Sequence, residues 1–477
     1  MGVKRFPVLV SLVAVLSSCG GGGGGDSAPP LVTVPTPSPT PSPTPTAGCS
    51  LRERQDWVNT QMREWYLFPE LLPAALDPSG YTSVQGFIDA LTATARAQSK
   101  DRYFTYITSI AEENAFYNSG SSAGFGVRLT YDTAGGRVIV AEAFENAPAL
   151  NAGIDRGTEI LAIGTSASNL RTVSSILAAE GAQGVTNALG PSDPGVSRLL
   201  RISKNGVTSD VTLVKANYDI QPVSSRYGAK IIDDGGKKVG YVNLRTFIST
   251  ANPQLRAAFA NFKSQGVTEV IVDFRYNGGG LVSVAELMGD LMGGGRSGSV
   301  FSYTTFRPEK ASNNETSFFD IQPESIAPTK LAFIGTTGTA SASELVINSF
   351  TPYLRANSAL IGTNTYGKPV GQIALDRSAC DDRLRVVAFR TENANRQGDY
   401  YTGLAGKVEA SCQAADDLFR PLGDPAEASV KGALDFLAGR TCTPIASGSQ
   451  SAQSLKPREL LQVNSPDTAQ REVPGSF

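Results

Sequence analysis

The sequence predicts a mixed α/β protein with an N-terminal helical cap, a β domain and an α/β core. Three changes in residue pattern support this division. Residues 49–118 carry apolar side chains at helical spacing, residues 119–218 alternate short strands with glycine-rich turns, and residues 219–446 alternate β-branched runs with helical stripes. A chain of 477 residues is also too long for one hydrophobic core, so two or three domains are expected.

The first residues have the features of an export signal. Lys4 and Arg5 precede an apolar run, Phe6 to Leu16, that is too short to span a membrane. The run ends at Leu-Ser-Ser-Cys, which resembles a bacterial lipobox and implies a signal peptide of residues 1–18 and lipidation of Cys19. An ordinary secretory signal is the alternative. We therefore expect a protein of the bacterial cell envelope, anchored by lipid and facing the periplasm, with the outer membrane as the expected site.

Low-complexity composition marks both ends of the chain. Residues 19–48 are glycine-rich and then rich in Pro, Thr and Ser, which predicts a tether between the anchor and the folded body. Residues 447–477 are polar and without periodicity, which predicts a disordered tail.

Charge and composition exclude several classes of function. The chain has 42 basic and 44 acidic side chains, and no cluster of Lys or Arg that would follow a nucleic-acid backbone. It contains no His at all, which excludes HExxH zinc hydrolysis and a His-based triad. No metal or organic cofactor is expected.

Four cysteines remain after Cys19, and an exported protein meets an oxidising compartment, so disulfides are expected. Four cysteines allow three pairings, and the sequence alone cannot choose between them. We favour Cys380 with Cys412, because both lie in one segment, and Cys49 with Cys442.

The helical cap has one clear apolar face. Val58, Met62 and Trp65 recur at i, i+4 and i+7, which predicts a first helix that also contains Trp57. A second helix is expected from Val84 to Ala97. We find no chemistry in this region and interpret it as packing against the main body.

Two stretches of the β domain, GFGV at residues 124–127 and AGIDRGTEILAI at residues 152–163, occur in order at a spacing that resembles a PDZ domain. The resemblance implies that an exposed strand edge accepts a peptide and that the backbone of Gly124, Phe125, Gly126 and Val127 binds its terminal carboxylate. A small β domain that serves only as a scaffold is the alternative interpretation.

The core begins with strand–helix–strand units. We expect a strand from Val239 to Leu244, a helix that starts near Pro253 and ends at Gly266, and a buried strand from Val267 to Phe274. The last strand leads into a glycine-rich turn, Asn-Gly-Gly-Gly at residues 277–280, and a helix. No Lys-Ser/Thr follows these glycines, so the turn is interpreted as an oxyanion hole instead of a phosphate-binding loop.

A strand at residues 331–334 then leads to TASASE, where Ser341 lies in a turn of small residues before a helix that Pro352 should limit. Another strand, residues 359–362, leads to a loop with Lys368, and a further strand is expected from Leu384 to Arg390. A Ser hydroxyl needs a base, and without His a Lys with a lowered pKa is the natural candidate. No Lys lies three residues after any Ser, so an SxxK dyad is excluded.

The order of a PDZ-like stretch, DxRxNxGG, TASASE and GKxxxQ resembles the C-terminal (tail-specific) processing peptidases over about residues 50–440. This resemblance implies that Ser341 is the nucleophile, Lys368 the general base and Gln372 a residue that orients the lysine. It also implies that the oxyanion is bound by the backbone N–H groups of Ala342 and of one glycine in the turn at residues 278–280, for which we favour Gly279. Ser343 stays open as an alternative nucleophile, and Gly278 stands where the family usually has proline.

The resemblance implies a serine endopeptidase that captures unstructured C-termini of exported proteins through its PDZ domain. The alternative is a non-catalytic, peptide-binding lipoprotein that keeps the fold. The sequence leaves open the physiological substrate, the oligomeric state, and whether the PDZ domain activates or inhibits the site.

Overall fold

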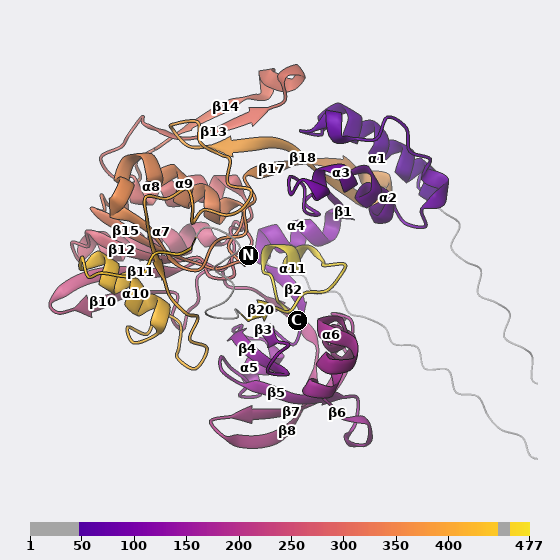
Figure 1. The fold of residues 1–477 in the computed structure, drawn as a ribbon, viewed down its shortest axis with the longest axis horizontal. Helices are drawn as coiled ribbons and strands as arrows, with labels where there is room; N and C mark the ends of the chain where they lie inside the picture. The colour runs from indigo at the N-terminus through magenta and orange to yellow at the C-terminus, as the bar shows by residue number, and fades with distance from the viewer. Residues whose placement is uncertain (1–46, 447–457) are drawn as a thin grey trace, which may run out of the picture. The chain divides into compact units, whose positions relative to one another are not determined.

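A computed structural model describes residues 47–446 and 458–477 of the chain (Figure 1). The predicted signal peptide, Cys19 and almost all of the predicted tether lie outside these residues. The described part contains helices together with three multi-stranded sheets and a two-stranded ribbon, so the predicted mixed α/β fold is confirmed.

The core sheet has six strands in the order β10-β11-β12-β15-β16-β19. The pair β10–β11 is antiparallel and all other neighbours are parallel. The strands are β10 (Ala229–Asp234), β11 (Lys237–Asn243), β12 (Glu269–Asp273), β15 (Lys330–Gly335), β16 (Ser358–Gly362) and β19 (Ala410–Gln413).

Both faces of the core sheet are covered by helices, which explains why its parallel strands are apolar on both sides. One face packs on α7 (Ala251–Ser264), α8 (Val282–Met292) and α9 (Ala342–Leu354). The other face packs on α10 (Ala428–Leu437). Neighbouring residues of one strand divide between the faces, since Phe333 belongs to the first cluster and Ile334 to the second. Ser341 directly precedes α9, at the carboxyl end of β15.

A second sheet joins the N-terminal helices to the core. Its strand order is β1-β18-β13-β14, with β17 also paired to β18. It packs on α1, whose Val58 and Met62 are fully buried as the spacing predicted. The elements are α1 (Leu51–Trp65), α2 (Val84–Leu91), α3 (Ala93–Ala97), β1 (Tyr106–Ser109), β13 (Val300–Phe306), β14 (Glu315–Phe318), β17 (Val370–Arg377) and β18 (Asp382–Glu392).

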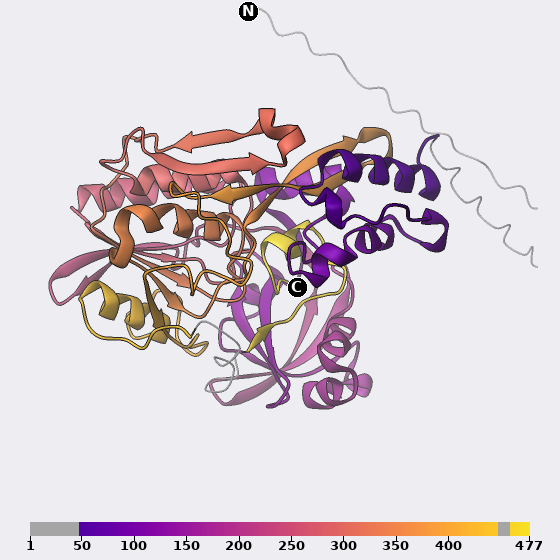
Figure 2. The same cartoon turned by 45° about the horizontal axis from the view of Figure 1, so that its top comes forward.

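The β domain contains the third sheet, in the order β20-β3-β4-β5-β7-β8, with β6 paired to β5. Most of its strands and its helices are drawn in purple and magenta in Figure 2. A helix, α4, precedes the domain, and the ribbon β2–β9 joins its two ends. The elements are α4 (Ile110–Ser119), β2 (Ser121–Gly124), β3 (Val127–Asp132), β4 (Arg137–Ala143), α5 (Pro148–Asn151), β5 (Glu159–Gly164), β6 (Arg171–Thr172), α6 (Val173–Leu189), β7 (Ser197–Lys204), β8 (Val207–Val214), β9 (Ala216–Asp219) and β20 (Glu459–Leu460).

The prediction of a disordered tail is wrong for residues 458–477, which we call the C-terminal segment. This segment forms β20 and the short helix α11 (Thr468–Glu472), and Leu461 and Val473 are fully buried. The segment has no periodicity because it folds against other parts of the chain and not on itself. Residues 447–457 lie outside the described part.

Three helix boundaries differ from the prediction. The expected helix at residues 84–97 breaks at Thr92 into α2 and α3, and α7 begins at Ala251, two residues before Pro253. Helix α9 continues through Pro352 to Leu354. The proline has no N–H for the carbonyl of Asn348, which instead accepts a hydrogen bond from the side chain of Asn393.

The favoured disulfide pairing is also wrong. Cys49 bonds Cys380, and Cys412 bonds Cys442. Cys380 closes the turn between β17 and β18, beside the start of α1 that Cys49 precedes. Cys412 lies on β19, in a different sheet from β18. Cys380 and Cys412 are close in sequence, but Cys380 lies in a turn of one sheet and Cys412 on a strand of another.

Candidate active site

Ser341 occupies a strained turn between β15 and α9. Its backbone has φ 55° and ψ −115°, a left-handed conformation that costs a non-glycine residue about 1–3 kcal/mol. A serine held at such a strand-to-helix turn is typical of hydrolase nucleophiles. By contrast, Ser343 is fully buried and its hydroxyl donates to the carbonyl oxygen of Asn277 at 3.2 Å. This geometry favours Ser341 over Ser343 as the reactive hydroxyl.

The glycine turn after β12 packs directly on Ser341. A Cβ atom at Gly279 would lie 2.7 Å from Ser341 Cβ and 3.2 Å from Ser341 Oγ, so no larger residue fits there. The same atom would lie 3.3 Å from the backbone nitrogen of Ala342, the first residue of α9. The first N–H groups of a helix have no intrahelical partner, so the Ala342 N–H can bind an anion beside Ser341.

The backbone donors of the glycine turn are engaged in this structure. The Gly279 N–H donates to Asn277 Oδ1 at 2.9 Å. The Gly278 N–H donates to the carbonyl oxygen of Glu472, in the C-terminal segment, at 3.0 Å. The C-terminal segment therefore engages Gly278, the glycine that the sequence left open as a donor beside the favoured Gly279.

Buried ion pairs hold this turn in place. Arg275, which is almost fully buried, pairs with Asp273, Asp416 and Glu427 at 2.7, 3.1 and 3.0 Å. Arg156 of the β domain pairs with Asp416 at 2.6 Å, and the hydroxyl of Tyr276 donates to the same carboxylate. Because an unpaired buried charge is costly, these contacts fix the turn and connect it to the β domain.

Lys368 is held by Gln372, the residue that the sequence analysis expected to orient it. Its Nζ donates to Gln372 Oε1 at 2.9 Å, and Gln372 Nε2 donates to the carbonyl oxygen of Phe104 at 2.6 Å. Burial lowers the pKa of the Lys368 ammonium, while the nearby carboxylates of Glu472 and Asp101 partly oppose this shift. The side chain of Lys368 is partly buried, and a lysine with a lowered pKa can act as a general base.

Glu344, which the sequence analysis did not identify as a site residue, joins the serine turn to the lysine loop. One carboxylate oxygen, Oε2, accepts from the backbone N–H of Ser341 at 3.0 Å and of Lys368 at 2.8 Å. The other, Oε1, accepts from Gly367 at 2.7 Å. The backbone nitrogens of Ser341 and Lys368 are therefore no more than about 6 Å apart. An acidic residue at the third position of a helix was the available signal in the sequence.

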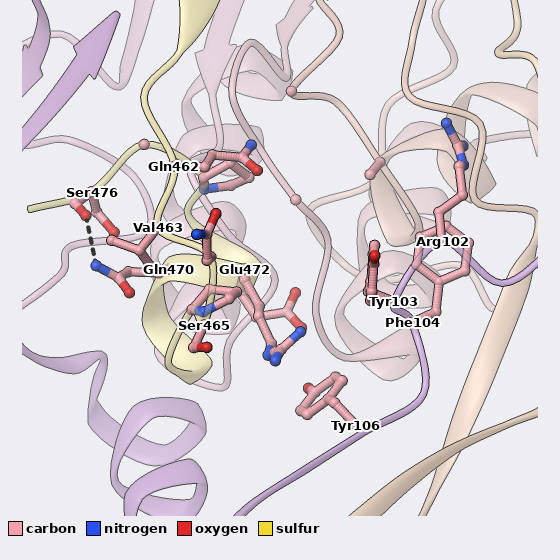
Figure 3. A pocket seen from close by; sticks show the side chains of 18 of the residues that line it. Arg102, Tyr103, Phe104, Tyr106, Gln462, Val463, Ser465, Gln470, Glu472 and Ser476 are labelled. Carbon is pink, nitrogen blue, oxygen red and sulfur yellow. Dashed lines mark hydrogen bonds between the residues drawn. The ribbon is translucent and has the colours of Figure 1, made fainter. Parts of the chain in front are cut away.

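The two predicted catalytic side chains do not contact each other by a hydrogen bond. Within residues 47–446 and 458–477, Lys368 Nζ hydrogen-bonds only to Gln372, and no hydrogen bond joins it to Ser341 Oγ. Lys368 and Gly278 line a cavity of about 710 Å³. Figure 3 shows side chains of the C-terminal segment on one side of this cavity and Arg102, Tyr103 and Phe104 on the other.

The predicted peptide-binding loop of the β domain is occupied by the last residue of the sequence. The N–H groups of Gly126 and Val127 both donate to the main-chain oxygen of Phe477, at 2.9 and 3.2 Å. A Cβ at Gly124 would lie 2.5 Å from the carbonyl carbon of Phe477, so this position requires glycine. Phe125 and Phe477 belong to the same buried apolar cluster.

The described residues, 47–446 and 458–477, lack the features of two other classes of protein. In that part of the chain, no three His, Cys, Asp or Glu side chains are arranged to hold a metal ion. None of its helices has the length and apolar composition needed to cross a bilayer.

Residues 238–397 match Peptidase family S41, and residues 53–106 match the Peptidase S41 N-terminal domain. The C-terminal processing peptidase, chloroplastic, of Tetradesmus obliquus is 30% identical over 276 residues, which cover 54% of each chain. The carboxyl-terminal-processing protease of a Synechocystis strain is 24% identical over 323 residues, which cover 67% of this chain and 70% of that protein. The chain spans about half the length of the first two curated relatives it matches.

A solved structure from Bacteroides fragilis, described as an S41 protease, has a similar fold. It aligns with a TM-score of 0.61 and 23% identity, over 80% of this chain and 97% of that one. At this identity the likeness concerns the fold alone.

Proposed function

Since the chain carries the core and N-terminal domains of peptidase family S41, we propose that it is a serine endopeptidase with a Ser341–Lys368 dyad. The observation that carries this proposal is the carboxylate of Glu344, which binds the backbone of both residues. It keeps the serine turn and the lysine loop adjacent, so that a change of side-chain rotamer can bring the amine to the hydroxyl.

In the proposed reaction, neutral Lys368 removes the proton of the Ser341 hydroxyl as Ser341 Oγ attacks the scissile carbonyl carbon. The negative charge that develops on the carbonyl oxygen is stabilised by the N–H of Ala342 and of Gly279, or of Gly278 where the C-terminal segment leaves it free. The protonated lysine then gives its proton to the leaving amine. Water hydrolyses the acyl-enzyme with Lys368 again as the base, and no metal or organic cofactor takes part.

Gln372 is a positioning residue in this scheme. It connects the lysine amine to the carbonyl of Phe104 and so restricts where the amine can lie. Burial supports the base role of Lys368, because a lowered pKa raises the fraction of neutral amine at a given pH.

We further propose that residues 119–218 form a PDZ domain that binds unstructured C-termini of exported proteins. The support is that Gly126 and Val127 already bind a main-chain oxygen of an extended segment beside β3. The export signal and the resemblance of residues 16–19 to a lipobox support a lipid anchor on Cys19 and a location facing the periplasm, at the outer membrane.

The test is digestion of β-casein by the wild-type chain and by the Ser341→Ala, Lys368→Ala and Ser343→Ala variants. We expect Ser341→Ala and Lys368→Ala to lose cleavage, although both variants should unfold at the same denaturant concentration as the wild-type chain. Ser343→Ala should retain cleavage. Full activity in Ser341→Ala or Lys368→Ala would exclude the proposed dyad.

A non-catalytic peptide-binding lipoprotein is the second candidate, favoured by one observation: Lys368 Nζ bonds Gln372 and not Ser341. A serine-directed fluorophosphonate separates the two functions. A peptidase becomes labelled at Ser341, whereas a pure binding protein stays unlabelled but still binds peptides.

A further inference from the structure

The C-terminal segment extends the sheet of the β domain along the free edge of β3. In β20, Glu459 and Leu460 pair antiparallel with Tyr131 and Thr130. Further along the same edge, the N–H of Phe477 donates to the carbonyl of Val127 at 2.8 Å. The edge on which a peptide ligand would add is therefore already paired with this chain's own residues.

The last residue of the segment fills the end of this groove. Phe477 is only 3% exposed and lies in the apolar cluster that includes Phe125 and Leu177. Its main-chain oxygen accepts from two successive N–H groups of the loop at residues 124–127. The groove thus accepts a large aromatic side chain together with a main-chain oxygen, which defines the chemistry of its ligand.

Between these two contacts with β3, the segment folds over the candidate catalytic residues. Helix α11 lies in this stretch, and the bond from Gln470 Nε2 to the carbonyl of Ser476 at 3.2 Å closes the loop that follows it (Figure 3). The carbonyl of Glu472 takes the N–H of Gly278, and a Cβ at Gly278 would lie 2.6 Å from the carbonyl oxygen of Arg471.

The side chain of Glu472 adds an electrostatic effect on Lys368. The carboxylate is almost fully buried and accepts from the hydroxyl of Tyr117 at 2.9 Å. Its charge raises the pKa of Lys368, whereas Arg471 of the same segment lowers it, and burial keeps the net shift of this pKa downward.

We propose that residues 458–477 are an intramolecular ligand that occupies the peptide groove and the approach to Ser341. A substrate that ends in a large apolar residue competes with this segment for the same edge of β3. The functional consequence of this inference rests on the proposed function, because displacement of the segment would open the site of a peptidase to its substrate. The docking itself involves no catalysis and can be tested separately.

The test measures binding of a fluorescent peptide with the sequence of residues 470–477, QREVPGSF, by fluorescence anisotropy. The full chain carries Ser341→Ala, so that cleavage does not affect the result. A tethered ligand competes at an effective concentration on the order of millimolar, so the wild-type groove should bind the peptide weakly. The Phe477→Ser variant should bind it at least about tenfold more tightly.

The matched control is Phe318→Ser, which removes a phenylalanine on β14 that is 53% exposed. This variant should bind the peptide as weakly as the parent chain does. A peptide in which the terminal Phe is replaced by Ser should not bind any of the proteins. Equal affinity of the two peptides, or of the Phe477→Ser and Phe318→Ser variants for QREVPGSF, would overturn the proposal.

Hydrogen exchange on the chain with native Phe477 provides a second measurement if Phe477→Ser fails to fold. Saturating QREVPGSF should increase exchange in residues 458–477, while β3 stays protected because the peptide replaces the segment. Unchanged exchange in residues 458–477 would show that the segment is not displaced, and would refute the proposal. Affinity that depends on protein concentration would show docking between copies and would equally refute an intramolecular ligand. Because none of these readouts needs peptidase activity, a failure here is distinct from a failure of the Ser–Lys assignment.

Discussion

Replacement of Glu344 by Gln tests the contact that joins the serine turn to the lysine loop. The native carboxylate accepts three backbone N–H groups, from Ser341, Gly367 and Lys368. A glutamine keeps one acceptor oxygen and faces at least one of these donors with its own NH₂ group. One unpaired buried donor costs about 1–3 kcal/mol, and the remaining bonds lose their charge assistance.

We therefore expect Glu344→Gln to lower the free energy of unfolding by about 2–4 kcal/mol. It should also lower kcat on a β-casein-derived peptide by about 10²-fold, since a displacement of about 1 Å has that effect on a positioned dyad. Urea unfolding and steady-state kinetics measure the two quantities. Glu309→Gln is the control, because its side chain is 68% exposed and should change stability by no more than about 0.5 kcal/mol. If Glu344→Gln matched this control in both assays, Glu344 would not be the link.

Three further predictions concern other parts of the molecule. Because burial lowers the pKa of Lys368 and only the neutral amine is a base, kcat/KM should rise with pH to a plateau, with a midpoint below the ordinary lysine value of about 10.4; a flat profile would exclude a titrating lysine. Replacement of Cys49 and Cys380 by Ser should lower the free energy of unfolding by about 2–5 kcal/mol in urea, since this bridge closes a separation of 331 residues; unchanged unfolding would show that the bridge adds no stability. Gly124→Ala should abolish protection of residues 458–477 in hydrogen exchange, because its Cβ would lie 2.5 Å from Phe477, and retained protection would contradict that contact.

The regular elements were largely predictable because the core is built from strong local patterns. The β-branched run at residues 267–274 contains β12, and Val58 and Met62, which were predicted to share one helix face, are buried on α1. Parallel strands covered on both faces are apolar throughout, and helices on a sheet carry one apolar stripe, so each leaves a signal in a single sequence.

The predictions that were wrong concern features that depend on contacts between distant segments of the chain. One disulfide joins Cys49 to the turn between β17 and β18, and the other joins Cys412 on β19 to Cys442 beyond α10; the spacing of the cysteines indicates neither pairing. The C-terminal segment lacks periodicity because it forms two short pairings with β3 and one helical turn between them.

Some residues of the candidate site were also predictable from the sequence, and one was not. Ser341, Lys368 and Gln372 were identified from a motif, and the bond from Lys368 to Gln372 exists in the structure. The role of Glu344 depends on its contact with the backbone of Lys368, 24 residues further along the chain, and this contact is visible only in three dimensions.

The most direct measurement of the central claim is the rate at which a fluorophosphonate labels Ser341, located by mass spectrometry of the labelled peptide. Two proteins are compared, and both carry Phe477→Ser to open the site. One keeps Lys368, and the other carries Lys368→Met, which keeps the length of the side chain and removes the amine. If Lys368 is the general base, only Ser341 should be labelled, and the labelling rate should be at least about 10²-fold lower in Lys368→Met, the range typical of a general base. Equal rates in the two chains, or labelling at another serine, would contradict it.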